Sequence, residues 1–180
     1  MVTGGKHMNN IAIIGATGLL GKQLAKYKNT VSCPIRFEES SMYQKWFAEN
    51  TNIDTVWHVA RACRKINPRR DYKTFNLEIK AMQDLLSTRA RDCKFFYAST
   101  KVVYGVTYET SPLPAHTVAE EFISEQLGVV NIPQWKDNKE VSLKNLSKNH
   151  KIYATTKLRC EQMIQKKCKN FKIVRIWDII

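Results

Sequence analysis

Two side chains in the last fifth of the chain have the types and the spacing that proton transfer needs. Tyr153 and Lys157 stand at i and i+4, so on a helix they share one face and can point into one site. A nearby ammonium favours the ionised phenolate, and a phenol tuned in this way exchanges a proton with a substrate hydroxyl or carbonyl. Taken alone, the pair is also common on exposed helices, so its weight depends on a second motif.

A glycine-rich turn supplies that motif. Asn10–Ile14 is a short run rich in β-branched residues, and Gly15, Gly18 and Gly21 come directly after it. Gly15 permits a tight turn, Gly18 lets the backbone approach a pyrophosphate, and Gly21 allows close packing of the following helix. Free amides at the start of that helix would face the phosphates. The turn predicts a dinucleotide site, and hydride transfer to or from a nicotinamide becomes the chemistry that the tyrosine and lysine would serve.

The elements that must position these residues alternate between strands and helices. We expect strands at 10–14, 29–33, 54–60, 94–98 and 171–177, and helices at 22–28, 72–91 and 151–167, with one more helix through Tyr43, Trp46 and Phe47 capped by Ser40 or Ser41. This alternation predicts a single α/β domain, a doubly wound parallel sheet of the Rossmann type, over residues 9–180. An irregular insertion is expected at about residues 106–150. Residues 1–8 are expected to be a leader, without the apolar stretch of a signal peptide.

In the order of its motifs, the sequence resembles the extended branch of the short-chain dehydrogenase/reductases, the NAD-dependent epimerase/dehydratase family. The resemblance rests on residues 15–21, 54–60, 98–105, 153–157 and 173–176. The spacing around the second strand looks most like the dTDP-4-dehydrorhamnose reductase subgroup. The resemblance implies a nucleotide-linked sugar as substrate, NADP or NAD as cofactor, and oxidoreductase or epimerase/dehydratase activity with tyrosine acid/base catalysis.

The resemblance also implies roles for individual residues. Tyr153 would be the acid/base, Lys157 would hold the nicotinamide ribose hydroxyls, and Thr100 would hydrogen-bond the substrate oxygen. Asn76 matches an asparagine that family members often have on their fourth helix, and a purely structural role for it is equally open. The cofactor would be lined by Gly15, Thr17, Gly18, Leu19, Leu20, Gly21, Ala60 and Arg61.

The sequence departs from the family pattern in two places that bear on function. NAD-preferring members usually end the second strand with an acidic residue, whereas Arg36 stands in this region and favours the 2′-phosphate of NADP; Glu38 or Glu39 keeps NAD open. Extended members continue into a C-terminal lobe that supplies much of the sugar site, and with the last residue at Ile180 we expect that lobe to be missing. A non-enzymatic dinucleotide-binding regulator or pseudoenzyme with a protein partner is therefore the alternative.

The charge and the cysteines limit the remaining classes of function. The net charge of +13 is concentrated in residues 61–94 and 136–180, which fits a solvated surface or the phosphates of an anionic ligand. No helix-turn-helix, zinc-finger or RNP signature supports nucleic-acid binding.

The 5 cysteines form no CxxC pair, so we expect no metal site and favour a reducing, cytoplasmic setting. No apolar run approaches the ~18 residues of a membrane helix. The family resemblance implies that a homodimer can form through the helices at 75–90 and 153–168.

Overall fold

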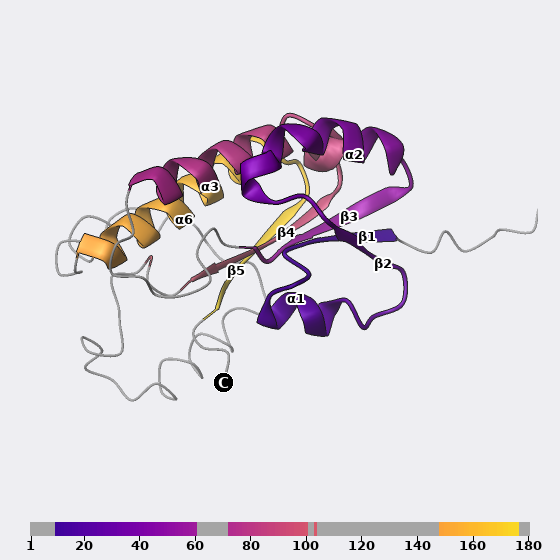
Figure 1. Ribbon diagram of the computed structural model, residues 1–180, viewed down its shortest axis with the longest axis horizontal. Coiled ribbons are helices and arrows are strands. Elements are labelled where there is room, and N and C mark those ends of the chain that lie inside the picture. Colours follow the sequence, from indigo (N-terminus) through magenta and orange to yellow (C-terminus); the bar gives the residue numbers. More distant parts are fainter. Residues whose placement is uncertain (1–9, 61–71, 101–102, 104–147, 177–180) are drawn as a thin grey trace, which may run out of the picture.

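The fold is built on one parallel sheet, described by a computed structural model in residues 10–60, 72–100, 103 and 148–176 (Figure 1). The strands are β1 (Asn10–Ile14), β2 (Thr30–Cys33), β3 (Ile53–His58), β4 (Lys94–Thr100) and β5 (Phe171–Ile176). They are hydrogen-bonded in the order β2-β1-β3-β4-β5, and all of these pairings are parallel. The expected α/β fold with a Rossmann-type sheet is confirmed.

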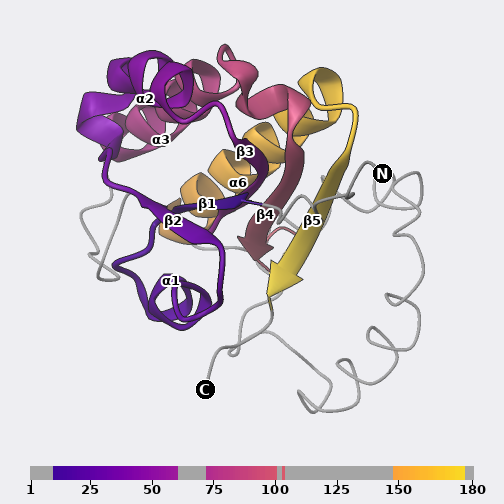
Figure 2. The same ribbon diagram turned by 90° about the vertical axis from the view of Figure 1, so that its right-hand side faces the viewer.

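Helices cover the two faces of the sheet unequally in this part of the chain. α2 (Tyr43–Glu49), α3 (Tyr72–Leu85) and α6 (Lys148–Lys167) lie on one face, and α1 (Leu19–Leu24) lies on the other. Figure 2 shows the same division from the side. The chain moves from β1 outward to β2, and then in the opposite direction to β3, β4 and β5. Right-handed crossovers in opposite directions place their helices on opposite faces.

The described core fills the space between the sheet and the three helices on its more covered face. Phe47, Leu85, Phe95 and Ile164 are all fully buried in one cluster and come from α2, α3, β4 and α6. Burying each of these side chains contributes roughly 1.5–3 kcal/mol relative to leaving it in water. The cluster therefore fixes how α3 and α6 lie against β4. The expected catalytic residues lie on α6 and β4.

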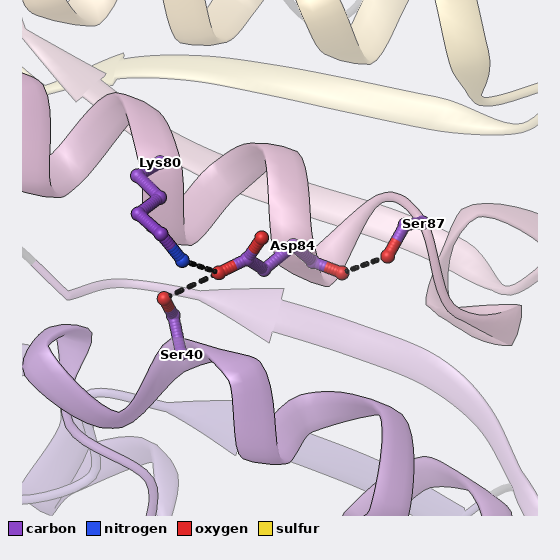
Figure 3. Close-up of polar contacts among 4 residues, drawn as sticks. All are labelled: Ser40, Lys80, Asp84 and Ser87. Atoms are coloured by element: carbon purple, nitrogen blue, oxygen red, sulfur yellow. Dashed lines mark hydrogen bonds and ion pairs between the residues drawn. The ribbon is translucent and has the colours of Figure 1, made fainter.

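A polar contact fastens the 3₁₀ helix η1 (Phe37–Met42) to α3. The hydroxyl of Ser40 donates to the Asp84 carboxylate at 2.6 Å, and the Lys80 ammonium lies 2.6 Å from the same oxygen (Figure 3). The Ser87 hydroxyl donates to the Asp84 backbone carbonyl. Burial acts to raise the pKa of Asp84, but the hydrogen bonds from Lys80 and Ser40 outweigh it and lower the pKa. The expectation that Ser40 or Ser41 caps α2 is wrong, because Met42 is the N-cap and makes no side-chain cap bond.

Two helices end earlier than their sequences predict. The helix expected through Lys28 ends at Leu24, and Asn29 follows with a φ of 65°, a conformation that a continuing helix excludes. The helix expected through Arg91 ends at Leu85, after which the Thr88 hydroxyl donates to the Leu85 carbonyl and accepts from an amide of η2 (Arg89–Asp92). Side-chain capping by a threonine thus replaces the last helical turn.

None of the described helices is long and apolar enough to cross a membrane.

Candidate functional site

The glycine turn joins the end of β1 to the segment that follows β3. Gly15 has a φ of +95°, and a Cβ placed on it would lie 2.7 Å from the Cα of Ala60. One residue earlier, the Ile14 carbonyl accepts a hydrogen bond from the Val59 amide at 2.9 Å. The backbone of the turn therefore lies against the backbone after β3, and only glycine allows both the positive φ and the close approach.

The other two glycines of the turn differ in their surroundings. A Cβ on Gly21 would overlap the carbonyl oxygen of Gly15 and lie 2.7 Å from the Cα of Ala16, so α1 packs directly on the turn. Gly18 is exposed, and a Cβ on it would come no closer to another atom than 3.3 Å, again to the Gly15 oxygen. Gly18 is also the N-cap of α1 and makes no side-chain cap bond. The turn thus has one packed side and one side open to a ligand.

Gly21→Ala is expected to destabilise the protein by about 1–3 kcal/mol, because backbone atoms that cannot rotate aside must shift to admit the methyl group. Gly18→Ala is the matched control, since it adds the same methyl group three residues away at an exposed position. Urea denaturation measures both. Equal midpoints for the two variants would contradict the packing described above.

Tyr153 and Lys157 lie one turn apart on α6 and face the sheet. Only 2% of the Lys157 side chain is exposed, and its Nζ lies 5.9 Å from the Tyr153 ring centroid and 5.0 Å from that of Tyr97 on β4. Tyr153 itself is half-buried. The i, i+4 spacing therefore brings the two side chains close together. They lie between α6 and the sheet, not on an exposed face of the helix.

Lys157 makes an ion pair that the sequence analysis missed. Its Nζ lies 2.9 Å from Oε1 of Glu78 on α3, and the Glu78 side chain is 6% exposed. One signal for it exists in the sequence: Glu78 stands at i, i+4 and i+7 with Met82 and Leu85, the pattern of a buried helix face. A carboxylate in such a stripe requires a buried partner.

The charges of this buried cluster follow from its surroundings. Burial acts to lower the pKa of Lys157, but the carboxylate of Glu78, followed by Tyr153, outweighs it, and the pKa lies above the usual value for lysine. His58, on β3, stacks on Phe37 and Phe95 and tilts against Tyr97. Burial lowers the pKa of His58 to about 3, and the Lys157 ammonium adds to the effect. At neutral pH the cluster therefore holds a charged lysine beside a neutral imidazole.

The strand that ends at Thr100 is tied to the helix of Tyr153 and Lys157. The Ser99 hydroxyl donates to the carboxylate of Glu161 on α6. Arg175 of β5 donates to both oxygens of that carboxylate, from Nη2 at 2.7 Å and from Nε at 3.2 Å. Thr100, the last residue of β4, is 8% exposed. This network holds the carboxyl end of β4 beside α6, where the expected Ser/Thr-Tyr-Lys chemistry requires it.

The remaining expected site residues that the structure describes follow the carboxyl ends of β1, β2 and β3. Arg36 is exposed and is the N-cap of η1, just after β2. Thr17 and Leu19 are exposed, and Leu20 and Ala60 are half-buried. Arg61 lies outside the described residues, as does most of the expected insertion. Within the residues that are described, no group of three or more His, Cys, Asp or Glu side chains gathers as metal ligands would, and Cys33, Cys93, Cys160 and Cys168 are free thiols.

Comparisons with known proteins give one family and several related folds. The family model described as "Male sterility protein", an NAD-binding family, matches residues 40–179. A comparison with curated protein sequences gives no match.

Solved structures with the same fold come from several enzymes. dTDP-4-dehydrorhamnose reductase from Bacillus anthracis, in complex with NADP, is 19% identical, with a TM-score of 0.56 over 94% of this chain and 53% of that one. GDP-mannoheptose C4 reductase from Campylobacter jejuni, with NADP bound, is 14% identical, with a TM-score of 0.59 over 98% of this chain and 50% of that one. L-threonine dehydrogenase from Phytophthora infestans is 16% identical, with a TM-score of 0.56 over 93% and 53% of the two chains. The chain thus spans about half the length of these structures.

Proposed function

Because the chain belongs to the NAD-binding family described as "Male sterility protein", we propose that it binds NADP(H) and takes part in hydride transfer to or from a nucleotide-linked sugar. The observation that carries the proposal is the placement of Tyr153 beside the buried ammonium of Lys157. These residues lie on a helix tied to the end of β4, at the edge of the sheet where the ends of β1 and β3 also meet. In open α/β sheets this edge is where ligands bind.

The glycine turn supports the cofactor part of the proposal. Its open side at Gly18 is a cradle that a larger side chain would fill, and the backbone there can approach a pyrophosphate. Arg36, exposed after β2, is the residue that we assign to the 2′-phosphate of NADP. The Bacillus and Campylobacter reductases named above are both NADP complexes, which agrees with this choice over NAD.

The proposed roles of the side chains follow from their chemistry. A bound reduced nicotinamide would supply the hydride. Tyr153 would give its phenolic proton to the carbonyl oxygen that becomes the alcohol, and would take it back in the reverse direction. Thr100 would hydrogen-bond the same oxygen and so orient the substrate. Lys157 would donate to the ribose hydroxyls of the cofactor, which its three N–H donors allow alongside the contact with Glu78.

The nucleotide-linked sugar is proposed on the family resemblance of the sequence and on the names of two of the similar structures, which are reductases of dTDP- and GDP-linked sugars. The third, an L-threonine dehydrogenase, has the same fold and a different substrate. The substrate class is therefore tested separately from the cofactor, by offering nucleotide-linked 4-keto sugars and L-threonine in parallel with the reduced or oxidised cofactor.

Gly18→Asp is expected to abolish cofactor binding, because a carboxylate would fill the open side of the turn and repel the pyrophosphate. Isothermal titration with NADPH and NADH compares the unmodified chain with Gly18→Asp. Gly18→Ala is the control that adds volume without adding charge. Tighter binding of NADPH than of NADH supports the assignment of Arg36. Heat from neither cofactor at millimolar concentration would overturn the proposed function.

A further inference from the structure

The ammonium of Lys157 is compensated by a carboxylate from another helix. Its Nζ lies 2.9 Å from Glu78 Oε1, and both side chains are almost completely buried. The pair joins α6 to α3, which pack side by side on the same face of the sheet (Figure 1). An ammonium in such a place is costly unless a partner of opposite charge and good geometry compensates it.

Another carboxylate, that of Glu161, is nearer to Lys157 in the sequence but binds other residues. Glu161 stands one turn after Lys157 on α6, a spacing at which carboxylates and lysines commonly pair. Both of its oxygens accept from Arg175, and one also accepts from the Ser99 hydroxyl. The two buried carboxylates are thus divided between two cations: Glu161 binds Arg175, and Glu78 binds Lys157.

Among the described residues, Tyr153 and Cys160 also act to raise the pKa of Lys157, but each acts less strongly than the Glu78 carboxylate. The ring of Tyr97 lies 5.0 Å and that of Tyr153 lies 5.9 Å from Nζ, distances at which aromatic faces attract a cation without neutralising it. His58, which also lies close enough to be influenced by Lys157, is neutral at physiological pH. Of the residues that the structure describes, Glu78 therefore contributes most to keeping this ammonium charged, and its contact at 2.9 Å holds the ammonium in one orientation.

We propose that Glu78 is a positioning residue of the cofactor site, which holds the Lys157 ammonium charged and oriented for the ribose hydroxyls of the bound dinucleotide. An ammonium has three N–H donors, so a carboxylate that fixes one of them leaves the others for a ligand. Because the side chain is already ordered, less rotamer entropy is lost on binding. The inference rests on the proposed function for the ribose contact and adds a residue on a different helix to it.

The first test is the effect of Glu78→Gln on cofactor affinity and on its pH dependence. The dissociation constant of NADPH, measured by its fluorescence, should rise roughly tenfold at neutral pH, the order expected when a charge-assisted hydrogen bond is lost. The alkaline loss of affinity should also move to lower pH, because burial then acts on Lys157 without its carboxylate. Glu78→Asp, which keeps the charge on a shorter side chain, should recover part of both properties.

Asp84→Asn is the matched control, because Asp84 also lies on α3 and also pairs with a lysine, Lys80. It removes one carboxylate from the same helix without touching Lys157, and should leave both the affinity and its alkaline limb unchanged. If the alkaline loss of NADPH affinity shifts in Glu78→Gln but not in Asp84→Asn, the effect comes from the positioning of Lys157 and not from a general loss of stability.

The second test reads Lys157 directly and needs no cofactor. In protein labelled with ¹³C-lysine, the Cε signal of Lys157, assigned as the one absent from Lys157→Met, should titrate above the usual lysine range in the unmodified chain. Titration at or below that range, or a Glu78→Gln variant that binds NADPH with an unchanged affinity and pH profile, would overturn the proposal. If the unmodified chain binds neither NADPH nor NADH, the proposed function is wrong. The positioning role is then also wrong, even if the lysine signal shows that the ion pair exists.

Discussion

Tyr153→Phe is expected to lower kcat for the NADPH-dependent reduction of a nucleotide-linked keto sugar by about 100- to 10,000-fold, the range typical for the loss of a general acid. The substitution removes the phenolic oxygen and leaves the ring that lies 5.9 Å from the Lys157 ammonium. The fold and the cofactor affinity should therefore be retained, and the loss should appear in kcat with the KM for NADPH unchanged. The decrease in NADPH absorbance under single-turnover conditions measures the step itself.

Tyr27→Phe is a suitable control for that experiment. Tyr27 is 64% exposed, and its ring meets that of Trp57 edge-on. It follows α1 in the chain, and α1 lies on the opposite face of the sheet from α6. Loss of its hydroxyl should leave kcat unchanged. If Tyr153→Phe also keeps the full rate in a chain with detectable activity, acid/base use of this tyrosine is wrong, and a dinucleotide-binding regulator becomes the better interpretation.

Acid is expected to destabilise the protein through His58. In the folded protein the pKa of His58 is about 3 because of its burial, whereas an unfolded histidine titrates near 6.5. Below that pH the unfolded state binds a proton that the folded state excludes, so this stability is complete above about pH 6.5 and is lost as the pH falls toward 3. At about pH 4.5 the loss amounts to roughly 2.5–3 kcal/mol.

His58→Phe and His58→Gln test this pH dependence. Phenylalanine fits a site whose neighbours are the rings of Phe37 and Phe95, at centroid distances of 6.0 and 6.4 Å from the imidazole, and glutamine replaces one neutral polar group with another. Neither titrates, so each variant should lose less free energy of unfolding than the unmodified protein between about pH 7 and 4.5. Urea denaturation at the two pH values measures the difference. A pH dependence identical to that of the unmodified protein in both variants would show that His58 is not the group responsible.

The sequence was sufficient for the parts of the fold that depend on local chemistry. The spacing of Gly15, Gly18 and Gly21 after a β-branched run predicts a strand, a tight turn and a helix, and the structure contains all three. The alternation of strands and helices predicts the parallel sheet. The family resemblance is confirmed by the match of residues 40–179 to an NAD-binding family, which covers all the motifs that carry the resemblance except the glycine turn. The binding roles of the individual residues remain predictions.

Contacts between distant elements were beyond the reach of the sequence. Glu78 meets Lys157, and Ser40 meets Asp84, only because the sheet brings α3 against α6 and η1 against α3. A propensity argument assigns Ser40 to the nearest helix end, whereas its hydroxyl makes a stronger bond to a carboxylate on another helix. The early ends of α1 and α3 were missed although the contacts that follow them are local: the hydroxyls of Thr30 and Thr88 donate to the backbone carbonyls of Tyr27 and Leu85.

The contact of Arg175 with Glu161 also contributes to the alignment of the last strand. β5 pairs with β4 so that Arg175 lies opposite Ser99. Arg175 shares its face of the strand with Phe171 and Ile173, which pack against the core, whereas Val174 on the other face is 42% exposed. Sliding β5 by one residue would turn Arg175 to the opposite face of the sheet and leave the Glu161 carboxylate buried without its guanidinium. The same shift would turn Phe171 and Ile173 away from the core, so the buried ion pair and the apolar packing both select the observed pairing of the last described strand.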